Sequence, residues 1–145
     1  AHVVDNERPI YLDSIAWGGE ATILRRDVDM DLALLVCKPD KYDNVKTLKL
    51  ADKELEVGDN VLAACAPLGI PLIVIHGKLA RERVSLVLGE MMVLDLAGGA
   101  PGVSGGAVCN SSGEMIGVMR AGSDVGSIVL CVPITDIKKF LKETM

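Results

Sequence analysis

The stretch GGAPGVSGGAVCNSSGEMIGV, residues 98–118, decides how this chain is interpreted. Its first nine residues place five glycines around one small hydroxyl, Ser104. Glycines let the backbone turn sharply and aim its amide groups inward, because they lack a Cβ. A serine that attacks a carbonyl needs such amides to hold the oxyanion, and it needs a base nearby. Two interpretations of the loop are open: a nucleophile loop, with the amides of Gly102 and Ser104 as donors, or a glycine-rich hairpin.

Short apolar runs surround this loop along most of the chain. They are rich in Val, Ile and Leu and are separated by turn signals, a rhythm that predicts an all-β sandwich or barrel. The charged segment KLARE, residues 78–82, is expected to separate two of the runs. The expected strands are residues 21–26, 32–36, 60–65, 72–77, 83–89, 90–97, 105–109, 115–122 and 128–134.

The C-terminal segment has a different period. Ile137, Phe140 and Leu141 are spaced i, i+3 and i+4, which predicts a helix with one apolar face over residues 136–144. Thr135 precedes this pattern and is the expected N-cap, because a threonine oxygen can accept from the first unpaired helix amides.

Bulk composition excludes several classes of protein. The chain has 145 residues, of which 50% are hydrophobic and 24% charged, with a net charge of −5. That is enough for one globular domain with a core. No basic cluster could follow a phosphate backbone, so no nucleic-acid partner is expected. No apolar run reaches the roughly 18–20 residues of a membrane span, and no signal peptide is visible, so no membrane partner is expected.

The cysteines do not suggest a metal or redox site. They form no CxxC pair, and each lies in or beside an apolar segment: Cys37, Cys65, Cys109 and Cys131. We therefore interpret them as small buried hydrophobes, and we expect no metal and no cofactor. Free thiols and an acidic chain favour an intracellular or virion setting, and a periplasmic one stays open.

Ser104 would need an imidazole to take its proton and a carboxylate to orient that imidazole. The chain has two histidines, and His76 lies within an expected strand, where a structural role is the simpler interpretation. His2 is the remaining base. Asp31 lies at the mouth of an apolar strand, where a carboxylate is shielded, although a plain turn residue is the simpler interpretation of Asp31 alone. The chain order His2, Asp31, Ser104 is one of three orders known for this geometry.

On these residues the chain resembles a trypsin-like serine protease of the chymotrypsin fold, and within it the HtrA-type proteases. The landmarks run in order over nearly the whole chain. AHVV (1–4) resembles the segment of the catalytic histidine, and ATILRRDVDMDLALL (21–35) that of the catalytic aspartate. LEVGDNVLAACAPLG (55–69) resembles the connection into the second barrel. PGVSGGAVCNSSGEMIGV (101–118) resembles the nucleophile loop, and LCVPITDIKKFL (130–141) the last strand and C-terminal helix.

The resemblance implies an all-β fold of two six-stranded antiparallel Greek-key β-barrels, the first incomplete in this chain, with a C-terminal helix. It also implies a single protease domain that hydrolyses peptide bonds of a polypeptide substrate through an acyl-enzyme on Ser104. The expected parts are the remainder of the first barrel (1–50), a connection (51–60), the second barrel (61–133) and the helix (134–145).

The same resemblance assigns roles residue by residue. His2 is the expected general base and acid, Asp31 orients its imidazole, and Ser104 attacks. The amides of Gly102 and Ser104 form the expected oxyanion hole. The expected substrate-binding residues are an edge strand of Arg120, Ala121 and Gly122, a pocket floor at Gly98, and pocket walls at Gly122 and Gly126. No charge is expected at that floor, which implies an uncharged side chain before the cut, although the Arg120 guanidinium could reach the cleft.

Three departures from the resemblance matter. Val103 stands where digestive trypsins carry an aspartate that pairs with a new N-terminus, so activation of that kind is not expected. No peptide-binding module follows the helix, as it usually does in HtrA-type proteases, so we expect a bare protease domain or a piece of a longer protein. Two strands of the first barrel are absent before His2, so we expect an upstream segment of the same protein that completes this barrel.

Three functional hypotheses follow. The leading one is an active serine endopeptidase, because every residue type of the triad is present and in order. The alternative is a catalytically inactive protease-like structural or protein-binding domain, which the incomplete first barrel keeps open. The third is an unrelated all-β domain that contains GVSGG by chance.

Overall fold

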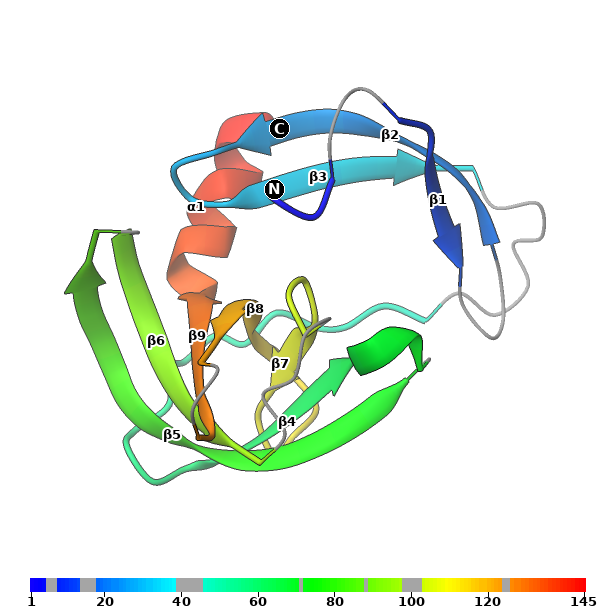
Figure 1. Cartoon of the computed structure of the whole chain (residues 1–145). Coiled ribbons are helices and arrows are strands. Elements are labelled where there is room, and N and C mark those ends of the chain that lie inside the picture. The colour runs from blue at the N-terminus through cyan, green and yellow to red at the C-terminus, as the bar shows by residue number, and fades with distance from the viewer. Residues whose placement is uncertain are drawn as a thin grey trace. The chain divides into compact units, whose positions relative to one another are not determined.

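Strands make up most of the described residues in the computed structural model of this chain (Figure 1). The structure describes residues 1–4, 8–13, 18–38, 46–70, 72–87, 89–97, 103–123 and 126–145. Its strands are β1 (Ile10–Asp13), β2 (Gly18–Asp27), β3 (Leu32–Cys37), β4 (Asn60–Cys65), β5 (Ile73–Leu86), β6 (Gly89–Leu96), β7 (Ala107–Cys109), β8 (Met115–Gly122) and β9 (Ile128–Pro133). The described residues also form a short 3-10 turn, η1 (Pro67–Gly69), and a helix, α1 (Ile134–Thr144).

The chain divides into two compact units, and the first, Ala1–Thr47, contains a three-stranded antiparallel sheet. Strand β2 lies in the middle, with β1 on one side and β3 on the other. The last pair of the β2–β3 hairpin joins Asp27 to Leu32. This tight hairpin places Asp31 in the turn, directly before β3.

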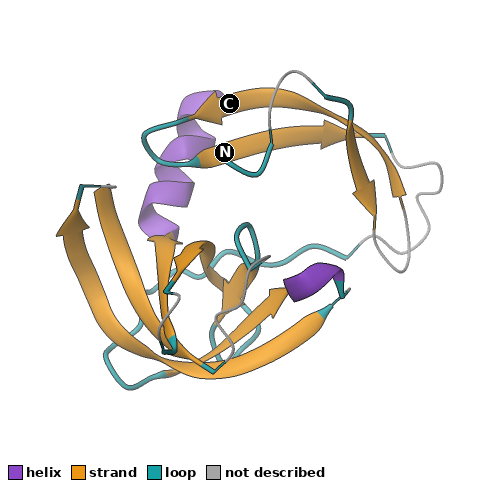
Figure 2. Cartoon of the chain, in the orientation of Figure 1, coloured by secondary structure: helices purple, strands orange, loops and turns teal. Residues whose placement is uncertain are grey.

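The second unit, Leu48–Glu143, contains a closed six-stranded barrel with the strand order β4-β5-β6-β9-β8-β7. Figure 2 shows its strands in orange and the helix in purple. The pairing of β4 with β7 closes it, and β6 lies beside β9, a neighbour far away in sequence. Each strand sends an apolar side chain that is 2% exposed or less into one core: Val61, Leu79, Leu94, Val108, Met119 and Cys131. This continuous core gives the barrel a rigid frame for the loops at its rim.

The predicted all-β fold with a C-terminal helix is confirmed, but the predicted break at residues 78–82 is wrong. Strand β5 runs through this segment without interruption. Its pairing with β6 shifts register between Leu79 and Arg81 and again between Arg81 and Val84. Such irregularities bend a strand without ending it, so the charged residues stay on the outside and the ladder continues.

Helix α1 has the predicted apolar face, with Ile137 and Phe140 buried. The predicted N-cap is wrong, because the helix begins at Ile134 and Pro133 occupies the cap position without a side-chain hydrogen bond. Thr135 is already inside the first turn. Its hydroxyl oxygen accepts a hydrogen bond from the guanidinium of Arg83, which is 52 positions away in sequence. A distant donor has therefore taken the oxygen that a local capping pattern would have used.

Candidate active site

Two glycines after Ser104 are required by the structure. Gly105 has a φ of +86°, in the left-handed region that favours glycine, and its amide donates to the Met119 carbonyl at 2.7 Å. A Cβ on Gly106 would lie 2.4 Å from Cε of Met119 and 2.7 Å from the carbonyl oxygen of Ala64. The glycines thus press the loop of Ser104 closely against the barrel.

The side chain of Ser104 is held by strand β8. Its Oγ donates a hydrogen bond to the carbonyl oxygen of Arg120 at 2.9 Å, in a partly buried position. Within the described part of the chain, the amide of Ser104 has no hydrogen-bond acceptor. A backbone amide that is left open beside a serine hydroxyl is what an oxyanion hole requires. Gly102, the second expected donor, lies outside the described residues.

His2 and Asp31, separated by 29 positions in sequence, are in direct contact in the first unit. The backbone amide of His2 donates to Oδ1 of Asp31 at 2.7 Å, and ring atom Nδ1 of His2 is hydrogen-bonded to Oδ2. The amino group of Ala1 lies 3.0 Å from Oδ1. Asp31 is also a turn residue, with φ of +55° and its amide donating to the Val28 carbonyl at 3.3 Å. The two interpretations of Asp31 are therefore compatible.

The Asp31 carboxylate is ionised at neutral pH. Burial of its side chain, which is 7% exposed, disfavours the charged form, but the hydrogen bonds from the Ala1 amino group and from His2 outweigh this effect. Together they lower the pKa of Asp31 from 3.8 to about 2. An ionised carboxylate only accepts hydrogen bonds, so Nδ1 of His2 must be the donor and Nε2 becomes the proton acceptor of the ring. This is the tautomer that a general base needs.

The remaining predicted residues fall in three places. The C-terminal end of β8 consists of Arg120, Ala121 and Gly122. Gly126 lies just before β9 and has a φ of +87°. Gly98 lies outside the described residues. The structure therefore brings His2 together with Asp31 in the first unit, and Ser104 together with Arg120 in the second.

One contact was not predictable from the sequence, namely the one between Ser104 and the Arg120 carbonyl. A backbone acceptor carries no residue signature, and its direction depends on an irregularity in β8. His76, interpreted as structural, is exposed on β5 opposite Leu62.

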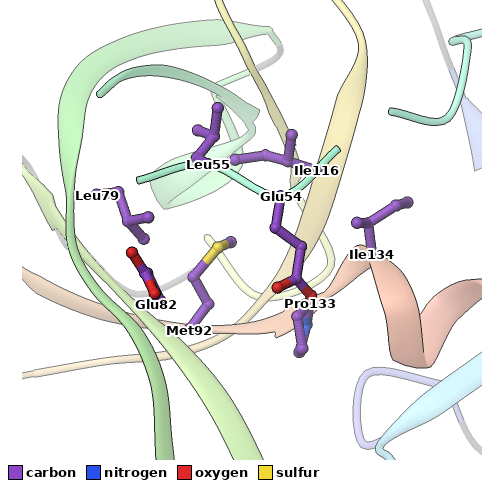
Figure 3. A pocket seen from close by; sticks show the side chains of 8 residues that line it. All are labelled: Glu54, Leu55, Leu79, Glu82, Met92, Ile116, Pro133 and Ile134. Carbon is purple, nitrogen blue, oxygen red and sulfur yellow. The ribbon is translucent and has the colours of Figure 1, made fainter. Parts of the chain in front are cut away.

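A separate small hollow lies on the second unit (Figure 3). Most of its lining is apolar, and the carboxylates of Glu54 and Glu82 lie among these side chains. The lining residues are Glu54, Leu55, Leu79, Glu82, Met92, Ile116, Pro133 and Ile134. The hollow contains no nucleophile or imidazole, so it adds nothing to the site around Ser104.

The cysteines carry no disulfide among the described residues. Cys65 and Cys131 are buried, as expected, whereas Cys37 and Cys109 are only half-buried. Burial raises the pKa of the Cys65, Cys109 and Cys131 thiols. In the same described ranges, no group of three or more His, Cys, Asp or Glu side chains could hold a metal ion. No helix among them is long and apolar enough to cross a membrane.

Comparisons with known proteins identify the family of this chain. A family model described as "Trypsin-like peptidase domain" matches residues 1–118. The "Probable periplasmic serine endoprotease DegP-like" of Buchnera aphidicola subsp. Schizaphis graminum is 32% identical over 152 residues, covering 98% of this chain and 31% of that protein. The "Periplasmic serine endoprotease DegP" of Escherichia coli K12 is 30% identical over 152 residues, with the same coverage of 98% and 31%. The chain thus spans about a third of the length of the curated relatives it matches.

A comparison of folds gives the same result. The crystal structure of the serine endoprotease from Yersinia pestis superposes with a TM-score of 0.82 at 22% sequence identity. The match covers 99% of this chain and 51% of the other. At this identity the likeness shows the fold alone. The resemblance drawn from the ordered sequence landmarks is therefore confirmed.

Proposed function

Because the chain belongs to the trypsin-like peptidase family, we propose that it is the protease domain of a serine endopeptidase. Ser104 is the nucleophile, His2 the general base and Asp31 the residue that orients it. The contact between Asp31 and the ring of His2 carries this proposal, since it sets the tautomer in which Nε2 can take a proton. No observation favours the alternative of an inactive structural or binding domain.

The chemistry follows from these assignments. As Oγ of Ser104 bonds to the substrate carbonyl carbon, its proton passes to Nε2 of His2, and the carbonyl oxygen becomes an oxyanion. The amides of Ser104 and Gly102 stabilise that oxyanion. His2 then gives the proton to the leaving amine as the peptide bond breaks. Water, deprotonated by the same imidazole, hydrolyses the acyl-enzyme and restores Ser104.

Substrate binding is proposed along the end of β8. The pairing of β8 with β7 ends at Val118, and the Met119 backbone is hydrogen-bonded to Gly105 and Gly106, whereas the pairing with β9 continues to Gly122. We propose that a polypeptide adds as an extra strand along the end of β8, at Arg120, Ala121 and Gly122. Gly98 at the floor and Gly122 and Gly126 at the walls would leave an uncharged pocket for the side chain before the cut.

The first unit supports a further proposal, an upstream segment of the same protein that completes its barrel. Its sheet has two edge strands, β1 and β3, and among its described residues only Ala21 and Leu32 are buried apolar side chains. An added strand would cover one edge and bury more of β3. The intact mass of the protein from its natural source tests this, and a mass equal to these 145 residues alone would contradict it.

The names of the relatives bear on the cellular setting. Several are named periplasmic, which supports the setting that the sequence left open rather than an intracellular or virion one. We propose a periplasmic protease that acts on polypeptides, within a single protease domain formed by residues 1–145.

Labelling with a fluorophosphonate probe, read by mass spectrometry, tests the proposed activity on the full-length protein. A covalent adduct on Ser104 is expected, and it should be lost in Ser104→Ala and strongly reduced in His2→Ala. His76→Ala is the matched control, because His76 is exposed on β5, and it should label at the unaltered rate. A folded full-length protein that gives no adduct on Ser104 would refute the proposal and return the inactive alternative.

A further inference from the structure

The hydroxyl of Ser104 has one proton, and in this structure that proton is already in a hydrogen bond. Oγ donates it to the Arg120 carbonyl oxygen at 2.9 Å, a normal hydrogen-bond length. A hydroxyl has only one O–H donor, so a proton that points at Arg120 cannot at the same time point at an imidazole. The nucleophile is therefore held in a resting orientation by strand β8.

An irregularity in β8 explains why this carbonyl is available to Ser104. Met119 pairs with Cys131 of β9, but the next paired residue is Ala121, with Leu130, so Arg120 is inserted between two regular pairs. Just before it, the Met119 amide donates to the Gly106 carbonyl at 2.9 Å. An extra residue of this kind re-aims backbone groups that would otherwise alternate strictly.

The same carbonyl lies on the strand edge where the substrate is proposed to bind. A peptide that adds to this edge supplies backbone N–H groups, and each needs a carbonyl acceptor on β8. Close to Ser104, the acceptor on the described strand is the oxygen that already receives the Oγ proton. A second donor at that oxygen weakens the first bond, because the two share one carbonyl dipole.

We propose that the Arg120 carbonyl is a shared acceptor, which holds the Ser104 hydroxyl in the free enzyme and exchanges it for a substrate backbone N–H. The exchange releases the hydroxyl to the base only when a peptide is aligned on β8. This inference rests on the proposed function and adds to it a positioning role for the backbone of Arg120. Electrophiles without a backbone N–H cannot displace the Ser104 hydroxyl from the Arg120 carbonyl. They should therefore react with Ser104 more slowly than their intrinsic reactivity predicts.

A backbone ester isolates the contact. Ala121→lactic acid keeps the methyl side chain but turns the Arg120 carbonyl into an ester carbonyl, a weaker acceptor. Leu130→leucic acid is the matched control, because it places the same change in the paired position of β9 and leaves the Arg120 carbonyl intact. Both are measured in the full chain with two probes for Ser104, a small alkyl fluorophosphonate without any amide and a peptidyl phosphonate with its backbone N–H.

The two probes should respond in opposite directions. In Ala121→lactic acid the small probe should react about threefold faster, since the ester carbonyl holds the Ser104 hydroxyl of the free enzyme less tightly. The peptidyl probe should react more slowly, because its N–H has lost a good acceptor. A small-probe rate that is unchanged, or that rises equally in the Leu130 control, overturns the inference. Absence of any Ser104 adduct in the unaltered protein would instead refute the proposed function.

A second measurement reads the contact itself and needs no backbone ester. The Arg120 carbonyl is labelled with ¹³C and ¹⁸O, and its isolated infrared band is compared between the unaltered protein and Ser104→Ala. Loss of the hydroxyl donor should move the band to higher frequency in the free protein. With a peptide bound on β8, the two proteins should give the same band. A band that Ser104→Ala leaves unmoved in the free protein contradicts the inference.

Discussion

Gly106→Ala tests whether the close approach behind Ser104 is required by the barrel. The added Cβ would lie 2.4 Å from Cε of Met119, 2.7 Å from the Ala64 carbonyl oxygen and 3.0 Å from Cβ of Cys65. The Met119 methyl is the end of a flexible side chain and can rotate away. The Ala64 oxygen is backbone, in the strand whose pairing with β7 closes the barrel, so that contact is relieved only if β7 moves away from β4.

The magnitude follows from these contacts. Overpacking by one carbon costs about 1–3 kcal/mol, and the smaller unfolded-state entropy of alanine returns part of it, which leaves a net loss of about 2 kcal/mol. For 145 residues, an unfolding entropy of about 2.1 cal/mol/K per residue gives about 0.3 kcal/mol per kelvin. Gly106→Ala should therefore lower the Tm by about 7 °C. Calorimetry measures this, and the fluorophosphonate adduct on Ser104 should fall in parallel at temperatures where the protein is still folded.

Two controls separate the clash from other effects. Gly113 has a φ of +76° and no atom within 4 Å of a built Cβ, so Gly113→Ala should cost only the backbone strain of about 1 kcal/mol, about 3 °C, and leave Ser104 labelling unchanged. In a double-mutant cycle, the cost of Gly106→Ala measured in a Met119→Ala background should be smaller than in the unaltered protein only by the part that belongs to the Met119 contact. A Gly106→Ala protein with unchanged Tm and full labelling would refute the reasoning.

Three further predictions concern other parts of the chain. In the chain of residues 1–145, hydrogen bonds from the Ala1 amino group and from His2 lower the pKa of Asp31 from 3.8 to about 2, so its carboxylate contributes about 2 kcal/mol of stability above pH 4. Measured on this chain, the Tm difference between the unaltered protein and Asp31→Asn should be present at pH 6 and disappear as the pH falls through about 2, and a pH-independent difference would contradict this. Phe140→Ala, at a side chain 3% exposed, should cost about 3–5 kcal/mol in urea unfolding, while Met145→Ala, at a fully exposed one, should change nothing measurable. Iodoacetamide should modify the half-buried Cys37 and Cys109 in the folded protein and reach Cys131, which is 0% exposed, only after unfolding, and equal rates at Cys131 and Cys109 would rule out the buried core position.

The parts of the fold that the sequence predicts are those with a local cause. Apolar runs between turn signals give the strands of the barrel, and the i, i+3, i+4 spacing gives α1. The parts that it misses depend on partners far away in the chain. Strand β5 continues through a charged segment because β6 pairs with it on both sides of two register shifts. Thr135 is not the cap because the helix begins one residue earlier, at Ile134, and the Thr135 oxygen accepts from the distant Arg83 instead.

The candidate site divides in the same way. The sequence alone shows the glycines around Ser104 and the order of His2, Asp31 and Ser104, because side-chain chemistry restricts which residue types can take these roles. The contributions of backbone groups cannot be predicted from the sequence. The His2 amide that fixes Asp31, and the Arg120 carbonyl that holds Ser104, belong to residues whose side chains play no part in either bond.

Each half of the proposed machinery is thus prepared inside its own unit, and largely by backbone. In the first unit a tight hairpin presents Asp31, and the chain before β1 places both the amide and the ring of His2 on its carboxylate. In the second, two glycines and an inserted residue in β8 fix Ser104 against a carbonyl. A single side-chain substitution cannot remove a backbone group. The orientation of Asp31 and of Ser104 should therefore tolerate substitutions at most of the positions around them. It follows that Asp31→Asn should remove the base's orientation while leaving the Arg120 infrared band unmoved, since both groups of the Ser104 contact belong to the second unit.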